Sequence, residues 1–152
     1  MLICNAEIRP KIIPVGDTHE LTEDGFERTF QMNYLAHVYL IKLLEDVLVA
    51  SAPSRVVLVS SLQHKMGSIR EGNISWDYIS PSTSENFDPV LAFGNSKKCM
   101  NLAAPFLAER LRERNVSVFS CYSEPESFVR KYKLFDWLCG ISKKKFLRTA
   151  VS

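Results

Sequence analysis

Four consecutive apolar residues, Val56–Val59, constrain the fold of this chain more than any other stretch. Three of the four are β-branched, and Arg55 and the pair Ser60-Ser61 flank them. A continuous β-branched run of this length is typical of a strand that is covered on both faces, as in a parallel sheet. The run therefore predicts a buried strand over residues 55–61.

A long amphipathic helix is predicted immediately before this strand. Thr22 is the expected N-cap, with Glu23 and Asp24 placed favourably against the helix dipole, and Pro53 lies just past the helix end. His37 is expected to be packed or hydrogen-bonded rather than a metal ligand, because no second ligand-type residue flanks it. The apolar face recurs at steps of three and four and consists of Phe26, Phe30, Tyr34, His37, Ile41, Leu44 and Leu48.

The rest of the chain continues the alternation of strands and helices, which predicts an α/β fold. Residues 2–4 and 116–121 are expected to be short strands, and residues 89–114 a second long helix. Residues 62–88 are expected to form a long polar excursion of the kind that often serves as a lid or substrate wall. We expect Trp76 and Tyr78 to hold this excursion against the body of the domain.

The end of the chain is rich in aromatic residues and predicts a packed helix. These residues are Phe128, Tyr132, Phe135 and Trp137, with Leu138 beside them. Lys143, Lys144, Lys145 and Arg148 follow and are expected to be solvated.

Composition limits the classes of function. The 152 residues carry a net charge of only +2, which gives no sign of a nucleic-acid surface. The four cysteines contain no C-x-x-C pair, so neither a metal site nor a disulfide framework is expected. No apolar run approaches the roughly 20 residues that span a bilayer, and the first residues lack signal-peptide features. We expect a cytoplasmic, soluble protein.

Residues 91–98 resemble the active-site helix of the short-chain dehydrogenase/reductase family. The family pattern is Tyr-x-x-x-Lys with a serine directly before the lysine. Lys97 and Ser96 match this pattern, whereas Phe93 takes the place of the tyrosine. Residues four apart share one helix face, so Phe93 and Lys97 are expected to lie together.

Three further stretches match the same family in the expected order. Residues 4–6, Cys-Asn-Ala, resemble its Asn-Ala-Gly turn, although Glu7 stands where glycine is usual. Residues 30–37 resemble the helix that carries the family asparagine, here Asn33. Residues 59–61 resemble the strand end that carries the family serine, here Ser61.

The resemblance implies a fold, a coenzyme and roles for these residues. The fold would be the C-terminal part of a Rossmann-like, doubly wound parallel sheet, as one partial domain over residues 1–152 with the first βαβ units missing. In the family the tyrosine is the acid/base, and the position of Lys97 lowers its pKa and binds the nicotinamide ribose of NAD or NADP. The resemblance also implies that Ser61 holds the substrate oxygen, that Asn33 holds a water, and that Asn5 and Ala6 touch the coenzyme.

The resemblance is strongest to the retinol-dehydrogenase-related and WW-domain-containing oxidoreductase branch. It rests on residues 21–33 and 51–61, on the insertion with Ile79-Ser80-Pro81, and on Asn95-Ser96-Lys97. The departures are Phe93, the pair Ser123-Glu124 where the family has Pro-Gly, and the lack of any G-x-x-x-G-x-G loop in these 152 residues.

Three hypotheses follow. The first is a truncated and catalytically impaired relative of NAD(P)-dependent oxidoreductases. The second is an active alcohol or carbonyl oxidoreductase of the retinol or steroid type whose sequence is incomplete at its start. Tyr34 and Tyr78 are candidate substitutes for the missing tyrosine hydroxyl. The third is an interaction module that forms a homo-oligomer, or a heterodimer with a full-length relative. An exposed edge strand would also make the fold marginal or dependent on a partner.

Overall fold

Three parallel strands form one sheet in the computed structural model, which describes residues 1–9, 19–70, 72, 74–85 and 87–122. The strands are β1 (Leu2–Cys4), β2 (Ser54–Val59) and β3 (Val116–Cys121), in the order β1-β2-β3. Leu2 pairs with Val56, and Ser54 pairs with Val116. The predicted α/β fold with a parallel sheet is confirmed, and the described part matches a partial Rossmann-like domain.

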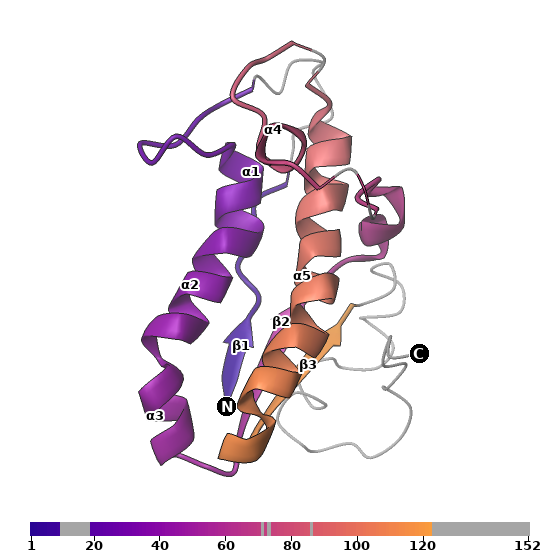
Figure 1. The fold of residues 1–152 in the computed structure, drawn as a ribbon. Helices are drawn as coiled ribbons and strands as arrows, with labels where there is room; N and C mark the ends of the chain where they lie inside the picture. Colours follow the sequence, from indigo (N-terminus) through magenta and orange to yellow (C-terminus); the bar gives the residue numbers. More distant parts are fainter. Residues whose placement is uncertain (10–18, 71, 73, 86, 123–152) are drawn as a thin grey trace.

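Strand β2 is covered on both faces, as its apolar run predicts. Val56 and Leu58 are completely buried, and Val57, which points to the opposite face, is 6% exposed. Figure 1 shows the long helices side by side on one face of the sheet. The core between sheet and helices contains Cys4, Ile41, Leu48, Val56, Leu58, Met100, Ala104, Leu107, Leu111, Val116 and Val118.

The first long helix begins later than predicted, so the prediction of Thr22 as its N-cap is wrong. Residues 21–27 form a tight turn instead, in which the Thr22 amide donates to the Phe26 carbonyl at 2.9 Å and Gly25 has a φ of +81°. The true cap is Glu27, whose two carboxylate oxygens accept hydrogen bonds from the amides of residues 29 and 30 at 2.8 and 2.7 Å. A carboxylate at this position also complements the helix dipole.

This helix is built from four consecutive pieces. They are α1 (Arg28–Phe30), a π-helical turn (Gln31–Leu35), α2 (Ala36–Leu43) and α3 (Glu45–Ala50). The predicted inward face is confirmed for Phe30, His37, Ile41 and Leu48, which are all buried. Phe26 lies in the turn before the helix.

The second long helix, α5 (Pro89–Leu111), agrees with its predicted position. Asp88 caps it by accepting hydrogen bonds from the amides of Val90 and Leu91 at 2.8 and 3.1 Å, and Pro89 occupies the first turn, where no amide donor is needed. A 3₁₀ turn (Arg112–Arg114) follows, and Asn115 ends it with a φ of 57°. The chain then enters β3 directly.

A buried carboxylate joins α3 to α5. Glu45 accepts from Lys42 at 3.2 Å, from Arg110 at 3.3 Å and from Arg114 at 2.6 Å. The hydrogen bond from Lys42 and the charges of the two arginines lower the pKa of the Glu45 carboxyl. The two long helices are therefore joined by charge as well as by apolar packing.

The excursion after β2 contains a 3₁₀ turn, η2 (Leu62–Met66), and a short helix, α4 (Trp76–Ile79). The Trp76 ring lies 5.8 Å from the ring of Phe26 and 6.2 Å from that of Phe30, measured between centroids. Tyr78 packs against the buried cluster that contains Phe30 and Cys99. The prediction that these two aromatic residues hold the excursion in place is confirmed. Ser123-Glu124, the predicted aromatic helix and the basic end all lie outside the described residues.

Among the described residues, the structure contains no helix whose length and apolar character would let it cross a membrane.

Candidate functional site

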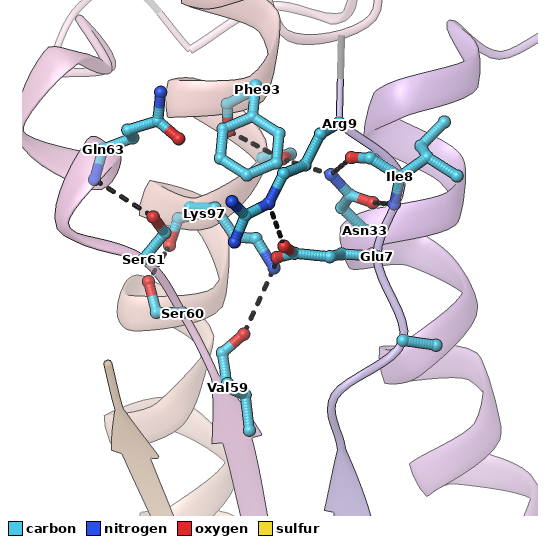
Figure 2. Close-up of polar contacts among 12 residues, drawn as sticks. Glu7, Ile8, Arg9, Asn33, Val59, Ser60, Ser61, Gln63, Phe93 and Lys97 are labelled. Carbon is cyan, nitrogen blue, oxygen red and sulfur yellow. Dashed lines mark hydrogen bonds and ion pairs between the residues drawn. The ribbon is translucent and has the colours of Figure 1, made fainter. Parts of the chain in front are cut away.

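The four matching stretches meet at the carboxyl end of the sheet. Figure 2 shows the turn after β1, the end of β2 and the middle of α5 facing one another there, with Lys97 between them. Polar side chains from strand ends and from one long helix are thereby gathered at one edge, the position at which parallel α/β sheets bind their ligands.

Lys97 is buried and lies beside Phe93, as the four-residue spacing predicts. Both residues are 0% exposed, and the Lys97 Nζ atom lies over the Phe93 ring, 5.6 Å from its centre. Nζ also donates to the Val59 carbonyl at 3.3 Å. A buried ammonium in this position needs a charged partner, because an unpaired charge in the interior is costly.

That partner is Glu7, from the turn after β1. Its Oε2 atom lies 2.7 Å from Lys97 Nζ, and its Oε1 atom lies 2.5 Å from Nε of Arg9. Burial raises the pKa of the Glu7 carboxyl, but the hydrogen bonds and charges of Lys97 and Arg9 outweigh this and lower the pKa from its ordinary value of 4.5. Glu7 is therefore ionised at neutral pH.

Asn33 fixes the backbone of the same turn. Its Oδ1 accepts from the Ile8 amide at 2.8 Å, and its Nδ2 donates to the Ile8 carbonyl at 2.9 Å. Nδ2 also lies 3.4 Å from the Ser96 hydroxyl, which in turn donates to the Phe93 carbonyl at 2.8 Å. Asn33 lies in the π-helical turn, a distortion often found at functional sites, and connects the first long helix to α5.

Asn5 and Ala6, the residues expected to touch a coenzyme, are exposed at the end of β1. The Ala6 carbonyl bonds His37 Nε2 at 2.7 Å, which confirms that His37 is a hydrogen-bonded residue of the helix face. The turn is therefore held on both sides of Glu7, at Ala6 by His37 and at Ile8 by Asn33.

Ser61 follows β2 and caps η2. Its hydroxyl accepts from the Gln63 amide at 3.2 Å. The neighbouring Ser60 donates to the Lys97 carbonyl at 2.9 Å, which fixes the end of the strand against α5. Ser61 thus lies at the same edge of the sheet as Lys97, and its role as the group that holds a substrate oxygen stays a prediction.

Two glycines allow α5 to approach the end of β2 this closely. A Cβ atom at Gly94 would lie 2.8 Å from the Gly67 nitrogen, and one at Gly67 would lie 2.7 Å from the Gly94 carbonyl oxygen. Neither position has room for a side chain. Backbone contact between η2 and α5 therefore sets the distance between the strand end and the Phe93–Lys97 face.

The two tyrosines that could replace the missing hydroxyl make other contacts. The Tyr78 hydroxyl bonds Ser68, and the Tyr34 ring packs 5.4 Å from that of Phe30. Burial raises the pKa of Tyr34. A raised pKa makes this hydroxyl a poorer proton donor, and Phe93 itself has none.

The residues present do not fit a nicotinamide coenzyme in this arrangement. A coenzyme ribose would need the Lys97 ammonium, which is bonded to Glu7 and Val59, and the Lys97 side chain is 1% exposed. Throughout the described part of the chain, every buried side-chain nitrogen or oxygen already has a hydrogen-bond partner. A coenzyme ribose could therefore reach the Lys97 ammonium only if the pairing with Glu7 were broken.

Glu7 and Arg9 are the residues whose position the sequence did not reveal. Glu7 stood out only as a departure from the glycine that is usual in the family. Its partner on α5 lies far along the chain, and neither helical spacing nor strand alternation could connect the two. A carboxylate replacing a glycine in a coenzyme-contacting turn was nevertheless a usable signal.

The described residues form no cluster suited to a metal, and their two buried thiols are poorly placed for nucleophilic chemistry. No group of three possible metal ligands occurs among the described residues. Cys4 and Cys99 are buried, and burial raises the pKa of each thiol to about 11. Such thiols are protonated at neutral pH and make weak nucleophiles.

WW domain-containing oxidoreductases and retinol dehydrogenases are similar to this chain. It is 42% identical to the chicken (Gallus gallus) WW domain-containing oxidoreductase and 43% identical to the human one, in each case over 119 residues that are 77% of this chain and 27% of the relative. It is 40% identical to mouse (Mus musculus) retinol dehydrogenase 13 over 66% of this chain and 28% of the relative. The chain thus spans about a quarter of the length of these relatives.

Solved structures agree on the fold. An uncharacterised protein from Mycobacterium paratuberculosis matches 95% of this chain and 50% of its own, with a TM-score of 0.64 and 28% identity. A metagenomic short-chain oxidoreductase in complex with NADP matches 96% of this chain and 57% of its own, with a TM-score of 0.53 and 16% identity. No protein-family model matches the sequence.

Proposed function

Because this chain belongs to the short-chain dehydrogenase/reductase family, we propose that it is a catalytically impaired form of the part of an NAD(P)-dependent oxidoreductase domain that it spans. The observation that carries the proposal is Phe93, a fully buried ring beside Lys97 where the family has its tyrosine.

The chemical argument concerns one proton. When a carbonyl is reduced to an alcohol, a proton must reach the carbonyl oxygen, and a positioned donor accelerates such a step about 10²–10⁴-fold. The Phe93 ring has no proton to give at neutral pH. The Lys97 ammonium, the only other group of this pair with protons, is paired with Glu7.

The neighbouring residues retain the arrangement that such a donor would need. Ser61 ends the strand at this edge, Lys97 is one turn from position 93, and Asn33 connects the first long helix to α5 through Ser96. In this proposal the site differs from the family pattern at the donor itself, while Ser61, Asn33 and Lys97 stand at the positions that the family pattern gives them. This makes restoration of the hydroxyl an informative experiment.

The test compares the wild-type chain with Phe93→Tyr in steady-state turnover at millimolar NADPH or NADH, with all-trans-retinal and a steroid ketone as probe substrates. We expect the wild type to show no turnover above background and the variant to gain about 10²-fold or more in kcat. Adding Ser61→Ala to Phe93→Tyr is the matched control and should remove the gain. Ordinary turnover by the wild type would overturn the proposal, and so would a Phe93→Tyr protein that is saturated with coenzyme and turns over no faster than the wild type.

A second candidate is an interaction module, favoured by apolar side chains exposed on both long helices. Leu43 and Phe106 are 62% and 69% exposed, at steps of four from other exposed apolar residues on their helices. Exposed apolar stripes of this kind mark contact surfaces in many soluble proteins. The remaining members of the two stripes are Tyr39, Val47 and Leu102. A homodimer or a heterodimer with a full-length relative would cover them.

A further inference from the structure

We propose that Glu7 blocks the coenzyme side of this site, because its carboxylate holds Lys97 in an ion pair that a nicotinamide nucleotide would have to break. The inference rests on the proposed function in one respect, the assignment of Lys97 to the coenzyme. It goes beyond that function by naming a second residue that disables the site, independently of the missing hydroxyl.

The first step is the geometry around the Lys97 ammonium. Nζ contacts the Val59 carbonyl, the face of the Phe93 ring and the Glu7 carboxylate. The Lys97 side chain is 1% exposed and that of Glu7 is 21% exposed, so the solvent-facing member of the pair is the carboxylate. A ligand that approaches from solvent meets Glu7 before it can reach Nζ.

The second step is that Glu7 cannot easily move aside. The backbone on either side of it is held, at Ala6 by the His37 ring and at Ile8 by two hydrogen bonds to Asn33. Its other carboxylate oxygen is bonded to Arg9. Opening the site therefore requires rotation of the Glu7 side chain against both cations, or release of the whole turn.

The third step is a comparison of partners. The ribose hydroxyls of a nicotinamide nucleotide are neutral, whereas Glu7 carries a full negative charge, so its attraction to the Lys97 ammonium includes a Coulomb interaction that the hydroxyls do not offer. The nucleotide also carries a phosphate, which the carboxylate repels. The charge of the Glu7 carboxylate and its repulsion of the phosphate both favour the Glu7–Lys97 pair over binding of the nucleotide.

The experiment uses reduced nicotinamide mononucleotide, which carries the nicotinamide ribose and its phosphate without an adenosine half. Titration calorimetry of the full chain should show saturable binding by Glu7→Gly, at least about tenfold tighter than the weakest binding that the same titration could detect for the wild type. Glu20→Gln, which removes an exposed carboxylate paired with Arg28, is the matched control and should behave as the wild type. Adding Lys97→Gln to Glu7→Gly should abolish the gain, since the ligand then has no ammonium to bind.

A second readout follows Lys97 directly. Acetylation by a water-soluble ester, read by mass spectrometry, should modify Lys97 slowly in the wild type and at least about tenfold faster in Glu7→Gly, because the amine then loses its ionic partner. Reduced nicotinamide mononucleotide should protect it in the variant only. If circular dichroism shows that Glu7→Gly does not fold, Glu7→Gln, which keeps the size of the side chain and removes its charge, serves in its place.

Binding of the mononucleotide by the wild type as tightly as by the folded Glu7 variant would overturn the inference, and so would a folded variant without any gain in binding. Neither readout needs turnover. The tyrosine is therefore compared in the Glu7→Gly background, where coenzyme can bind. A folded Glu7→Gly/Phe93→Tyr protein that binds the mononucleotide but turns over no faster than Glu7→Gly would contradict the proposed function and leave the role of Glu7 standing.

Discussion

The Glu7 carboxylate lies 2.7 Å from the ammonium of Lys97, and the Phe93 ring lies beneath the same ammonium with its centre 5.6 Å away. Two departures from the family pattern, one in the turn after β1 and one on α5, thus meet at one nitrogen atom. One removes a proton donor and the other places a carboxylate against Lys97. Experiments can separate the two departures, because Phe93 would affect proton transfer whereas Glu7 would affect coenzyme binding.

The Glu7–Lys97 pair should make the stability of the fold depend on pH. The pKa of Glu7 is lowered in the folded state, so its contribution is present above the ordinary value of 4.5 and is lost as the pH falls through the folded-state pKa. At neutral pH, Glu7→Gln leaves the buried Lys97 without an ionic partner and should lower the free energy of unfolding by about 1–3 kcal/mol. Urea unfolding across a pH series measures this.

The difference in unfolding free energy between the wild type and Glu7→Gln at each pH isolates the contribution of Glu7. Glu45, whose pKa the hydrogen bond from Lys42 lowers, contributes to the same loss of stability in acid, but it is present in both wild type and Glu7→Gln. The two curves should therefore converge at acidic pH, where Glu7 is protonated and neutral. Curves that stay parallel down to the lowest pH would contradict the ion pair.

The close approach of η2 to α5 predicts a cost for any side chain at Gly67. Its φ of −66° is ordinary, so space rather than backbone conformation requires glycine there. In Gly67→Ala the new Cβ would meet the backbone of Gly94 at 2.7 Å, which should destabilise the fold by about 1–3 kcal/mol. Thermal unfolding measures the loss, and Ser82→Ala, at an exposed position of the same excursion, should leave the transition unchanged. An equally small effect at both positions would argue against the packing described.

The exposed stripes on the long helices predict self-association. Sedimentation of the wild type should show a dimer that dissociates on dilution, and Phe106→Glu should shift it to the monomer by placing a charge in the apolar contact. Met66→Glu changes an exposed apolar residue on η2 and should leave the dimer intact. A wild type that stays monomeric and does not co-purify with a full-length relative would remove the interaction hypothesis.

The sequence predicted the elements well where one physical signal dominates. The β-branched run located β2, and the periodic apolar face located the inward side of the first long helix. The start of that helix was misplaced because Thr22, Glu23 and Asp24 have the composition of a helix N-terminus, while a turn around Gly25 and the capping of two amides by Glu27 determine the true start. Local composition cannot distinguish these two arrangements.

The sequence predicted which residues gather at the site, but it did not predict the ion pair between Glu7 and Lys97. The spacing of Phe93 and Lys97 on one helix places them together, and the order of motifs places Ser61 and Asn33 at the same edge. The pairing of Glu7 with Lys97 depends on the register of β1 beside β2 and on the anchoring of the turn by His37. These are tertiary features that no local pattern in the sequence encodes.

The measurement that tests the central claim most directly is NADPH oxidation with retinal by four proteins, the wild type, Glu7→Gly, Phe93→Tyr and the double variant. The account predicts that Phe93→Tyr raises kcat when it is added to Glu7→Gly, that Glu7→Gly in the tyrosine background lowers the KM for the coenzyme, and that the double variant exceeds either single variant in kcat/KM. A wild type that already turns over at an ordinary rate would contradict the account. A folded double variant with no more activity than the wild type would contradict it equally.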